Sequence, residues 1–323
     1  MRMVRQKLLW IVMIIVLVAC SAQPSAAPAD APASELSGTI AVSGAFALYP
    51  MMTIWAEEFQ KLHPNVEFDV QGGGAGKGMT DTLSGAVDIG MISRAIKPEE
   101  EEQGAFWVKV TEDAVYPVIS ADNPVAAQIV AKGISQETIA KIYITGEITT
   151  WGQVVGDPSI TDQINVYTRS DASGAAEMWA KFGGGKVQDD LKGVGVNSEP
   201  AMVDTVIKDP LGIGYSNLNS VYDPSTGGFV TGAVVPPLDI NQNGQADANE
   251  YYETKDEALQ AVADGIYPSP PARDEHLATK GKPTGLVLTF IEWILTDGQQ
   301  YLAPAGYVPL TSEEQRASLE KLK

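Results

Sequence analysis

Hydrophobic positions near the start of the folded chain alternate between the spacing of strands and that of helices. Residues 38–44, GTIAVSG, alternate and are rich in β-branched residues, which predicts a strand. Residues 48–64 carry apolar side chains three to four positions apart and end in a proline, which predicts a helix. A strand over 66–71, a short helix over 78–86 and a buried strand over 87–92 follow. This order predicts an α/β fold with an open, mainly parallel sheet.

The same alternation continues to the end of the chain. The acidic run over 97–104, KPEEEEQG, is predicted to be a solvated loop. The other expected elements are strands over 114–124 and 272–281, helices over 134–146 and 255–265, a strand, turn and helix over 165–182, a helix and strand over 200–218, and one long or broken helix over 283–307.

The first twenty residues have the pattern of an export signal. Basic residues precede an apolar stretch over 8–19, which is too short to span a membrane comfortably. It ends in LVAC, which resembles the lipobox of bacterial lipoproteins, so we expect residues 1–19 to be removed and Cys20 to carry a lipid. The alternative is an uncleaved membrane anchor with an incidental cysteine. Residues 20–35, rich in Ala, Pro and Ser, are expected to form a tether.

The composition is that of a soluble, acidic globular protein, and both readings of the leader place this part outside the cytoplasmic membrane. Hydrophobic residues make up 44% of the chain, and the formal net charge is −19. Loss of the basic leader would make this charge still more negative. Such a surface disfavours nucleic acid and anionic lipid headgroups as partners. A small anion bound in a pocket is still possible, because local donors govern such a site.

No motif predicts an enzyme. Both histidines, His63 and His276, are interpreted as structural or exposed, and Cys20 is the only cysteine. The motifs GxSxG and HExxH do not occur in the sequence. The glycine-rich stretch also lacks a phosphate-loop GK[ST], because Lys77 is followed by Gly78.

Two turns rich in hydrogen-bond donors each follow a predicted strand and precede a helix. They lie over 72–78, GGGAGKG, and over 170–174, SDASG. Helix N-termini at the carboxyl ends of strands present free N–H groups to anions. Arg169 adds a guanidinium fork that suits a tetrahedral oxyanion, and Asp171 could orient it. The pair of turns therefore predicts an anion site; a flexible turn is the alternative for the glycine loop alone.

The sequence from residue 36 onward resembles the phosphate-binding proteins of ABC importers. The resemblance lies in VSGAFALYPMM, DVQGGGAGKG, DIGMISR, YTRSDASGAAEMW, DPLGIGYSNL and AGYVPL. It implies a two-lobe type II periplasmic-binding-protein fold with a double crossover hinge. Lobe 1 would comprise residues 36–117 and 266–323, and lobe 2 residues 118–265. An anion would close between the lobes.

The resemblance also assigns anion-binding positions, although several family hydroxyls are missing. The assigned residues are Ala45, Phe46, Gly74, Ala75, Gly76, Arg94, Arg169, Ser173 and Gly174. Alanine replaces a family serine at Ala75 and a family threonine at Ala175. Arg94 stands where many members have an acidic residue, which would accept a hydrogen bond from protonated phosphate and repel sulfate. Arg94 would supply donors instead, unless it points away from the cleft.

Residues 239–250, DINQNGQADANE, fit the calcium-loop pattern D-x-[DN]-x-[DN]-G-x5-E. The expected ligands are Asp239, Asn241, Asn243, Gln245, Asp247 and Glu250. We expect at most one structural Ca²⁺ here, stapling an insertion in the second lobe, and no organic cofactor. The alternative is a polar surface turn, which Asn, Asp and Gly also favour.

Together these features predict a lipid-anchored, extracytoplasmic solute-binding protein that captures phosphate or a related tetrahedral oxyanion. The resemblance implies ABC permease subunits as partners, and we expect a monomer. One alternative is an anion sensor or adhesion protein that reuses the fold. Another is an extracellular hydrolase, which is disfavoured because no nucleophile–base pair or metal-ligand cluster is recognisable.

Overall fold

The computed structural model describes residues 36–323, which contain two hydrophobic cores. The first core gathers apolar side chains from residues 40–110 and 277–322. The second gathers side chains mainly from residues 114–272. We call the two parts of the chain around these cores lobe 1 and lobe 2. The chain therefore passes out of lobe 1 near residue 112 and returns near residue 274.

Lobe 1 is built on a sheet whose central strands are parallel. β1 (Ser37–Gly44) pairs in parallel with β2 (Asn65–Gly72) and with β3 (Ile89–Ile92). β11 (Ala272–Lys280) then adds antiparallel to β3. Parallel pairing brings the carboxyl ends of β1, β2 and β3 to one edge, which is where ligands bind in open α/β sheets.

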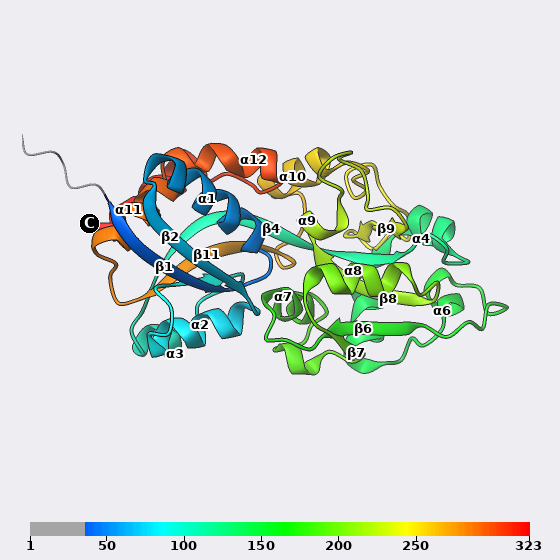
Figure 1. Ribbon diagram of the computed structural model, residues 1–323. Helices are drawn as coiled ribbons and strands as arrows, with labels where there is room; N and C mark the ends of the chain where they lie inside the picture. Colours follow the sequence, from blue (N-terminus) through cyan, green and yellow to red (C-terminus); the bar gives the residue numbers. More distant parts are fainter. Residues whose placement is uncertain (1–35) are drawn as a thin grey trace, which may run out of the picture. The chain divides into compact units, whose positions relative to one another are not determined.

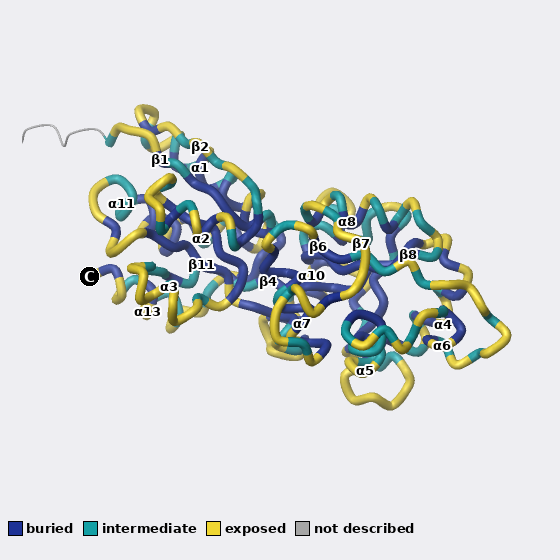
Figure 2. Tube along the Cα trace, turned by 90° about the horizontal axis from the view of Figure 1, so that it is seen from below, coloured by how far each residue is buried: buried dark blue, intermediate teal, exposed yellow. Residues whose placement is uncertain are grey.

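One long strand joins the two lobes. β4 (Ala105–Ser120) pairs with β11 along its first part and with β8 (Gly212–Asn217) along its second. β6 (Asn165–Arg169) and β7 (Val194–Val196) continue the strand order, which runs β2-β1-β3-β11-β4-β8-β6-β7. The second half of β4 is buried, as the dark trace in Figure 2 shows. The crossing strand is therefore part of the core, and β11 is the return crossing.

Helices cover the sheets on both sides. In Figure 1, α1 (Tyr49–Leu62) lies on one side of the first sheet and α2 (Ala75–Ser84) on the other. Further helices are α4 (Ala126–Lys132), α5 (Gln136–Ala140), α6 (Trp151–Val155), α7 (Gly174–Phe182), α8 (Glu199–Ile207), α9 (Leu218–Val221), α10 (Lys255–Ala263), α11 (Gly285–Ile294) and α12 (Leu302–Ala305). Short strands lie at β5 (Ile134–Ser135), β9 (Ala233–Val234) and β10 (Leu238–Asp239). This layered α/β architecture confirms the predicted fold class.

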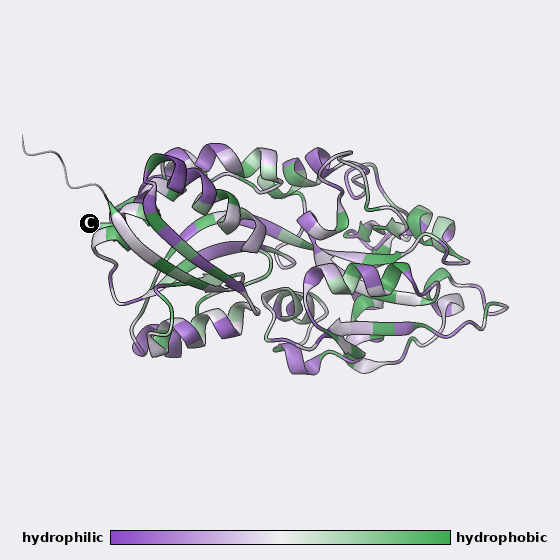
Figure 3. Cartoon of the chain, viewed as in Figure 1, coloured by the Kyte–Doolittle hydropathy of each residue, from purple (hydrophilic) through white to green (hydrophobic). Residues whose placement is uncertain are grey.

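Several elements depart from the sequence-based expectation, and two of them lie in lobe 1. The acidic run is not a loop, because α3 (Pro98–Glu102) forms there. Its proline starts the helix, and the Glu100 carboxylate accepts a hydrogen bond from the Lys97 backbone N–H at 2.8 Å. A run of glutamates also suits the positive end of a helix. In Figure 3, α3 is coloured mainly as hydrophilic. The second departure is α13 (Ser312–Leu322), a terminal helix that the pattern analysis did not predict.

Two expected helices are less regular than predicted. The helix expected over 134–146 ends as α5 and continues through a π-helical turn at Lys141–Thr145. The long helix expected over 283–307 is broken by a 3-10 turn at Asp297–Tyr301, between α11 and α12. Among residues 36–323, no helix is long and apolar enough to cross a membrane.

Candidate anion-binding cleft

The two predicted turns meet across the lobes. The Gly76 backbone N–H at the start of α2 donates a hydrogen bond to the Ala172 carbonyl at 3.0 Å. A Cβ atom built on Gly74 would lie 2.7 Å from the same carbonyl and 2.8 Å from Asp171 Oδ2. These approaches are too close for any side chain at Gly74, which also has φ +88°. Glycine is therefore required here so that the turn before α2 can touch the turn before α7.

The backbone donors of the glycine loop are largely used within the protein. Gly73 and Gly74 both donate to the Gly44 carbonyl, at 2.9 and 3.0 Å. Gly76 donates across the lobes, and Ala75 is buried as the first residue of α2. The expectation that this loop presents several free N–H groups is thus only weakly supported by the geometry. The loop instead fixes the distance between the lobes.

Arg169 is the central charge of the cleft. Its Nε and Nη2 bond to the two carboxylate oxygens of Asp171 at 2.8 and 2.6 Å, and its Nη1 forms an ion pair with Glu199. Its guanidinium carbon lies 5.8 Å from the centre of the Phe46 ring, which comes from the other lobe. Burial opposes the charge, but Glu199 and Asp171 raise the pKa of Arg169 above its usual value. Arg169 is therefore a buried, permanently charged group whose orientation is fixed by two acids.

The remaining predicted positions lie in the turn before α7 and at the end of β1. Ser173 caps α7, because its Oγ accepts a hydrogen bond from the Ala176 N–H at 3.2 Å. Gly174 lies directly against Ser93 of lobe 1, where a Cβ atom would overlap its backbone. Ala45 is buried at the end of β1 and donates its N–H to the Met91 carbonyl at 2.9 Å. The structure thus brings segments far apart in sequence to one place.

Arg94 lies beside the turns with its charge already paired. Its Nη1 and Nη2 bond to the Glu100 carboxylate at 2.9 and 2.5 Å, and its Nε lies 3.5 Å from Glu177 Oε2. Nη1 also donates to the Ala95 carbonyl at 2.8 Å. These contacts direct the guanidinium toward α3 and α7. A role for Arg94 as a donor to an anion stays a prediction, and it would require these contacts to open.

Several residues of the cleft had no signal in the motif analysis. Gln188 accepts from the Ser173 N–H at 2.8 Å and donates to the Asp171 carbonyl at 2.7 Å, so it fixes the second turn. A cavity of about 460 Å³ lies between these residues and Arg94. Glu199 is distant from Arg169 in the sequence. It becomes a candidate residue of the cleft only because α8 begins next to Arg169.

A second group of charges is buried at the crossing strands. Arg273 of β11 bonds to Asp113 of β4 at 2.9 Å and to Asn217 at 2.7 Å. Glu275 is fully buried 3.5 Å from Arg273. Burial raises the pKa of Glu275 well above its ordinary value; Arg273 opposes this rise, whereas Asp113 and Glu199 add to it. The carboxyl groups of Glu275 and Asp113 therefore share the same arginine where lobe 1 meets lobe 2.

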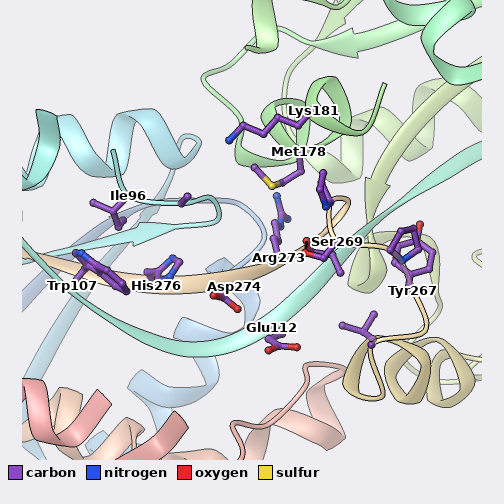
Figure 4. Close-up of a pocket in the computed structure, with 16 residues that line it drawn as sticks. Ile96, Trp107, Glu112, Met178, Lys181, Tyr267, Ser269, Arg273, Asp274 and His276 are labelled. Atoms are coloured by element: carbon purple, nitrogen blue, oxygen red, sulfur yellow. Dashed lines mark hydrogen bonds between the residues drawn. The ribbon is translucent and has the colours of Figure 1, made fainter. Parts of the chain in front are cut away.

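Another cavity, of about 580 Å³, lies between α7 and the crossing strands β4 and β11. Figure 4 shows Met178 and Lys181 of α7 above it, Trp107 and His276 at one end, and Arg273 rising from β11 toward Met178. Burial lowers the pKa of His276 to about 4, so this imidazole is neutral at pH 7. The histidine is thus structural rather than exposed, and the motif analysis did not foresee this cavity.

The predicted calcium loop folds back on itself. Asp239 accepts from the backbone N–H groups of Asn243 and Gly244, each at 3.0 Å. Glu250 accepts from the Ile240 N–H at 2.8 Å and from the Asp247 N–H at 3.0 Å. The side chains of Asn241 and Asn243 both donate to Asp247, at 2.6 and 3.2 Å, and Asn243 Oδ1 accepts from the Gln245 N–H at 2.8 Å. The loop therefore gathers its oxygen-bearing side chains on one side of the chain.

This oxygen-rich loop fits a hard cation only in part. In the described part of the chain, no three His, Cys, Asp or Glu side chains are grouped tightly enough to hold a metal ion. A Ca²⁺ ion would thus depend on amide and carbonyl oxygens beside the carboxylates. Cys20, the predicted lipidation site, lies outside the described residues.

The chain is similar to known proteins along most of its length. The model of the PBP superfamily domain matches residues 29–298. The phosphate-binding protein PstS of Bacillus subtilis is 28% identical over 279 residues, covering 86% of this chain and 82% of that protein. PstS of Pseudomonas aeruginosa is 26% identical over 331 residues, covering 94% and 93%.

Solved structures share the fold. The substrate-binding protein of a phosphate ABC transporter from Clostridium perfringens, crystallised with bound phosphate, matches with a TM-score of 0.68 and 22% identity, over 85% of this chain and 100% of that one. A phosphate transport receptor of the ABC type from Vibrio cholerae matches with a TM-score of 0.62 and 21% identity, over 84% and 100%. At these identities the likeness establishes the two-lobe fold alone.

Proposed function

The chain belongs to the PBP superfamily, and from that premise we propose that it captures inorganic phosphate, or a close oxyanion relative, for an ABC importer. The observation that carries this proposal is Arg169, buried and charged where the turns before α2 and α7 meet. Such a guanidinium suits an oxyanion closed between two lobes. The names of the curated relatives, phosphate-binding proteins of bacteria, support phosphate as the ligand.

The same reasoning supports binding without catalysis. Arg169, Asp171 and Glu199 form a paired charge network, and none of them is a nucleophile activated by a neighbouring base. We therefore propose a non-enzymatic, monomeric binding protein that delivers its ligand to permease subunits. Titration calorimetry of the mature domain with phosphate, sulfate, molybdate and arsenate tests the function. Phosphate is expected to bind with a micromolar or lower dissociation constant. The proposal would be refuted if none of the anions released heat and equilibrium dialysis also detected no binding.

We also propose that Cys20 is the point of membrane attachment. The proposal is supported by the LVAC sequence at the end of the apolar leader. Cys20→Ser is expected to release the protein into the medium or to leave it unprocessed, because the lipid is its anchor. Membrane fractionation and mass spectrometry measure this. An intact Met1 without lipid in the wild-type protein would contradict it.

We further propose that the loop over 239–250 binds one structural Ca²⁺. A metal bound only by the folded state stabilises that state by mass action. Millimolar Ca²⁺ is therefore expected to raise the melting temperature of the wild-type protein, and Asp239→Ala to abolish the rise. Asp223→Ala, which removes an exposed acid that caps a different turn, is the matched control and should keep the response. Equal melting curves in Ca²⁺ and in chelator would rule out the site.

A further inference from the structure

The cavity between α7 and the crossing strands has the size and walls of a site for a small organic molecule. Its volume of about 580 Å³ lies within the usual range of ligand pockets, roughly 300–1,000 Å³. Apolar side chains from both lobes form much of its wall: Ile96, Trp107, Met178, Val262, Tyr267 and Pro268. Its lining includes neither Arg169 nor any residue of the turns before α2 and α7. The cavity is therefore separate from the proposed phosphate site.

Arg273 is a buried cation in the wall of this cavity, and part of its guanidinium is unused. Its side chain is only 2% exposed, and Figure 4 shows it rising from β11 toward Met178. Nη2 bonds to Asp113 at 2.9 Å and to Asn217 at 2.7 Å. Nε and Nη1 have no hydrogen-bond partner among residues 36–323. Buried guanidinium nitrogens without an acceptor are costly, so these two atoms call for one.

The carboxylates around the cavity do not supply this acceptor. Glu112 and Asp274 line the cavity, but both form ion pairs with Lys109, at 2.5 and 2.7 Å. In Figure 4 these two acids lie below the β11 strand, whereas Arg273 rises above it. Glu275 approaches Arg273 only through Nη2, at 3.5 Å. An acceptor for Nε and Nη1 would therefore have to come from a ligand.

A carboxylate attached to an apolar body matches both properties of the cavity. Arginine and carboxylate form strong, charge-assisted hydrogen bonds. An apolar body would cover the apolar wall and remove it from water, which a bare inorganic oxyanion would not do. Lys181, also in the lining, already pairs with Glu177 at 2.9 Å, so Arg273 is the cation with unused donors.

We propose that this cavity is a second binding site, which takes a monocarboxylate with an aromatic or branched apolar body. The carboxylate accepts hydrogen bonds from Arg273, and the body packs against Ile96, Trp107 and Met178. The site goes beyond the proposed phosphate binding and does not rest on it.

Titration calorimetry of the mature protein with 3-phenylpropionate, indole-3-acetate and 4-methylpentanoate tests the proposal. At least one of them is expected to bind with a dissociation constant of about 1 mM or lower, and phosphate should not displace it. The neutral amide of the same acid lacks the charge, and acetate lacks the body. Each of these two compounds should bind at least about tenfold more weakly.

Two variants test the location of the site by different routes. Arg273→Gln should weaken binding of the carboxylate at least about tenfold, because hydrogen bonds to a charged group are lost. Since Arg273 also holds Asp113, Ala95→Trp provides a test that leaves the buried charges in place. Ala95 is exposed at the cavity, and a tryptophan there should fill it and weaken binding at least about tenfold. Ala127→Trp, at an exposed alanine of α4 outside the lining, is the matched control and should bind as wild type does.

The outcomes are independent of the proposed function. Binding of a carboxylate without any binding of phosphate would refute the proposed function and leave this site standing. The site is overturned if none of the three acids binds, or if the amide binds as tightly as its acid. It is also overturned if phosphate displaces the acid, or if folded Ala95→Trp protein binds the acid as tightly as wild type.

Discussion

Arg169→Ala is expected to lower phosphate affinity at least about 100-fold, because two charge-assisted hydrogen bonds of ~1.5–3 kcal/mol each are lost. The substitution should also destabilise the protein by about 3–5 kcal/mol. Asp171 and Glu199, both buried, would be left without the cation that now pairs with them. Titration calorimetry measures the first effect and chemical denaturation the second.

Arg169→Lys separates the loss of charge from the loss of geometry. A lysine keeps one positive charge but cannot bond to Asp171 through two parallel N–H groups as Arg169 does. We expect intermediate stability and an affinity between those of the wild type and the alanine variant. Folded Arg169→Ala protein that binds phosphate as tightly as wild type would show that the anion site lies elsewhere.

Gly76→Ala is expected to weaken phosphate binding at least about tenfold by holding the lobes apart, since overpacking typically costs about 1–3 kcal/mol. A Cβ atom at Gly76 would lie 2.5 Å from the Cβ of Ala172, and the hydrogen bond between their backbones would be strained. To relieve this overlap, the two Cβ atoms would have to move apart by about 1 Å. Gly76 lies within α2 and does not have a positive φ. Apart from this overlap, alanine is therefore favourable at the position.

The matched test removes the colliding methyl group from the other lobe. Ala172→Gly in the Gly76→Ala background should restore affinity to within about threefold of wild type, because the overlap is relieved. Gly85→Ala is the control: Gly85 directly follows α2 as its C-cap, and a Cβ atom built there would meet no atom within 4 Å. It should leave affinity unchanged, although its φ of +77° makes some loss of stability expected. Unaltered affinity of the single Gly76→Ala variant would show that these turns do not set closure.

Most strands and helices of the fold, and the chemistry of the central charge, were predictable from local sequence signals. The strand and helix spacing from residue 38 to residue 92 is local, because it depends only on which side chains face the core. The turns before α2 and α7 were recognisable for the same reason, since glycine and an arginine after a strand are local signals. The acidic run was mispredicted because a capping contact between Lys97 and Glu100 turns it into α3.

Which groups are free to meet a ligand depends on long-range packing. Gly76 and Ala172 are joined by a bond across the lobes, and Arg94 is neutralised by acids from α3 and α7. Glu199 reaches Arg169 because β6 and β8 are parallel neighbours and α8 precedes β8. Apart from the pair of Arg94 and Glu100, these contacts join residues tens of positions apart, and hydrophobic periodicity carries no information about them. The partners of a buried charge are fixed by packing, and packing also decides whether a donor is left for an anion.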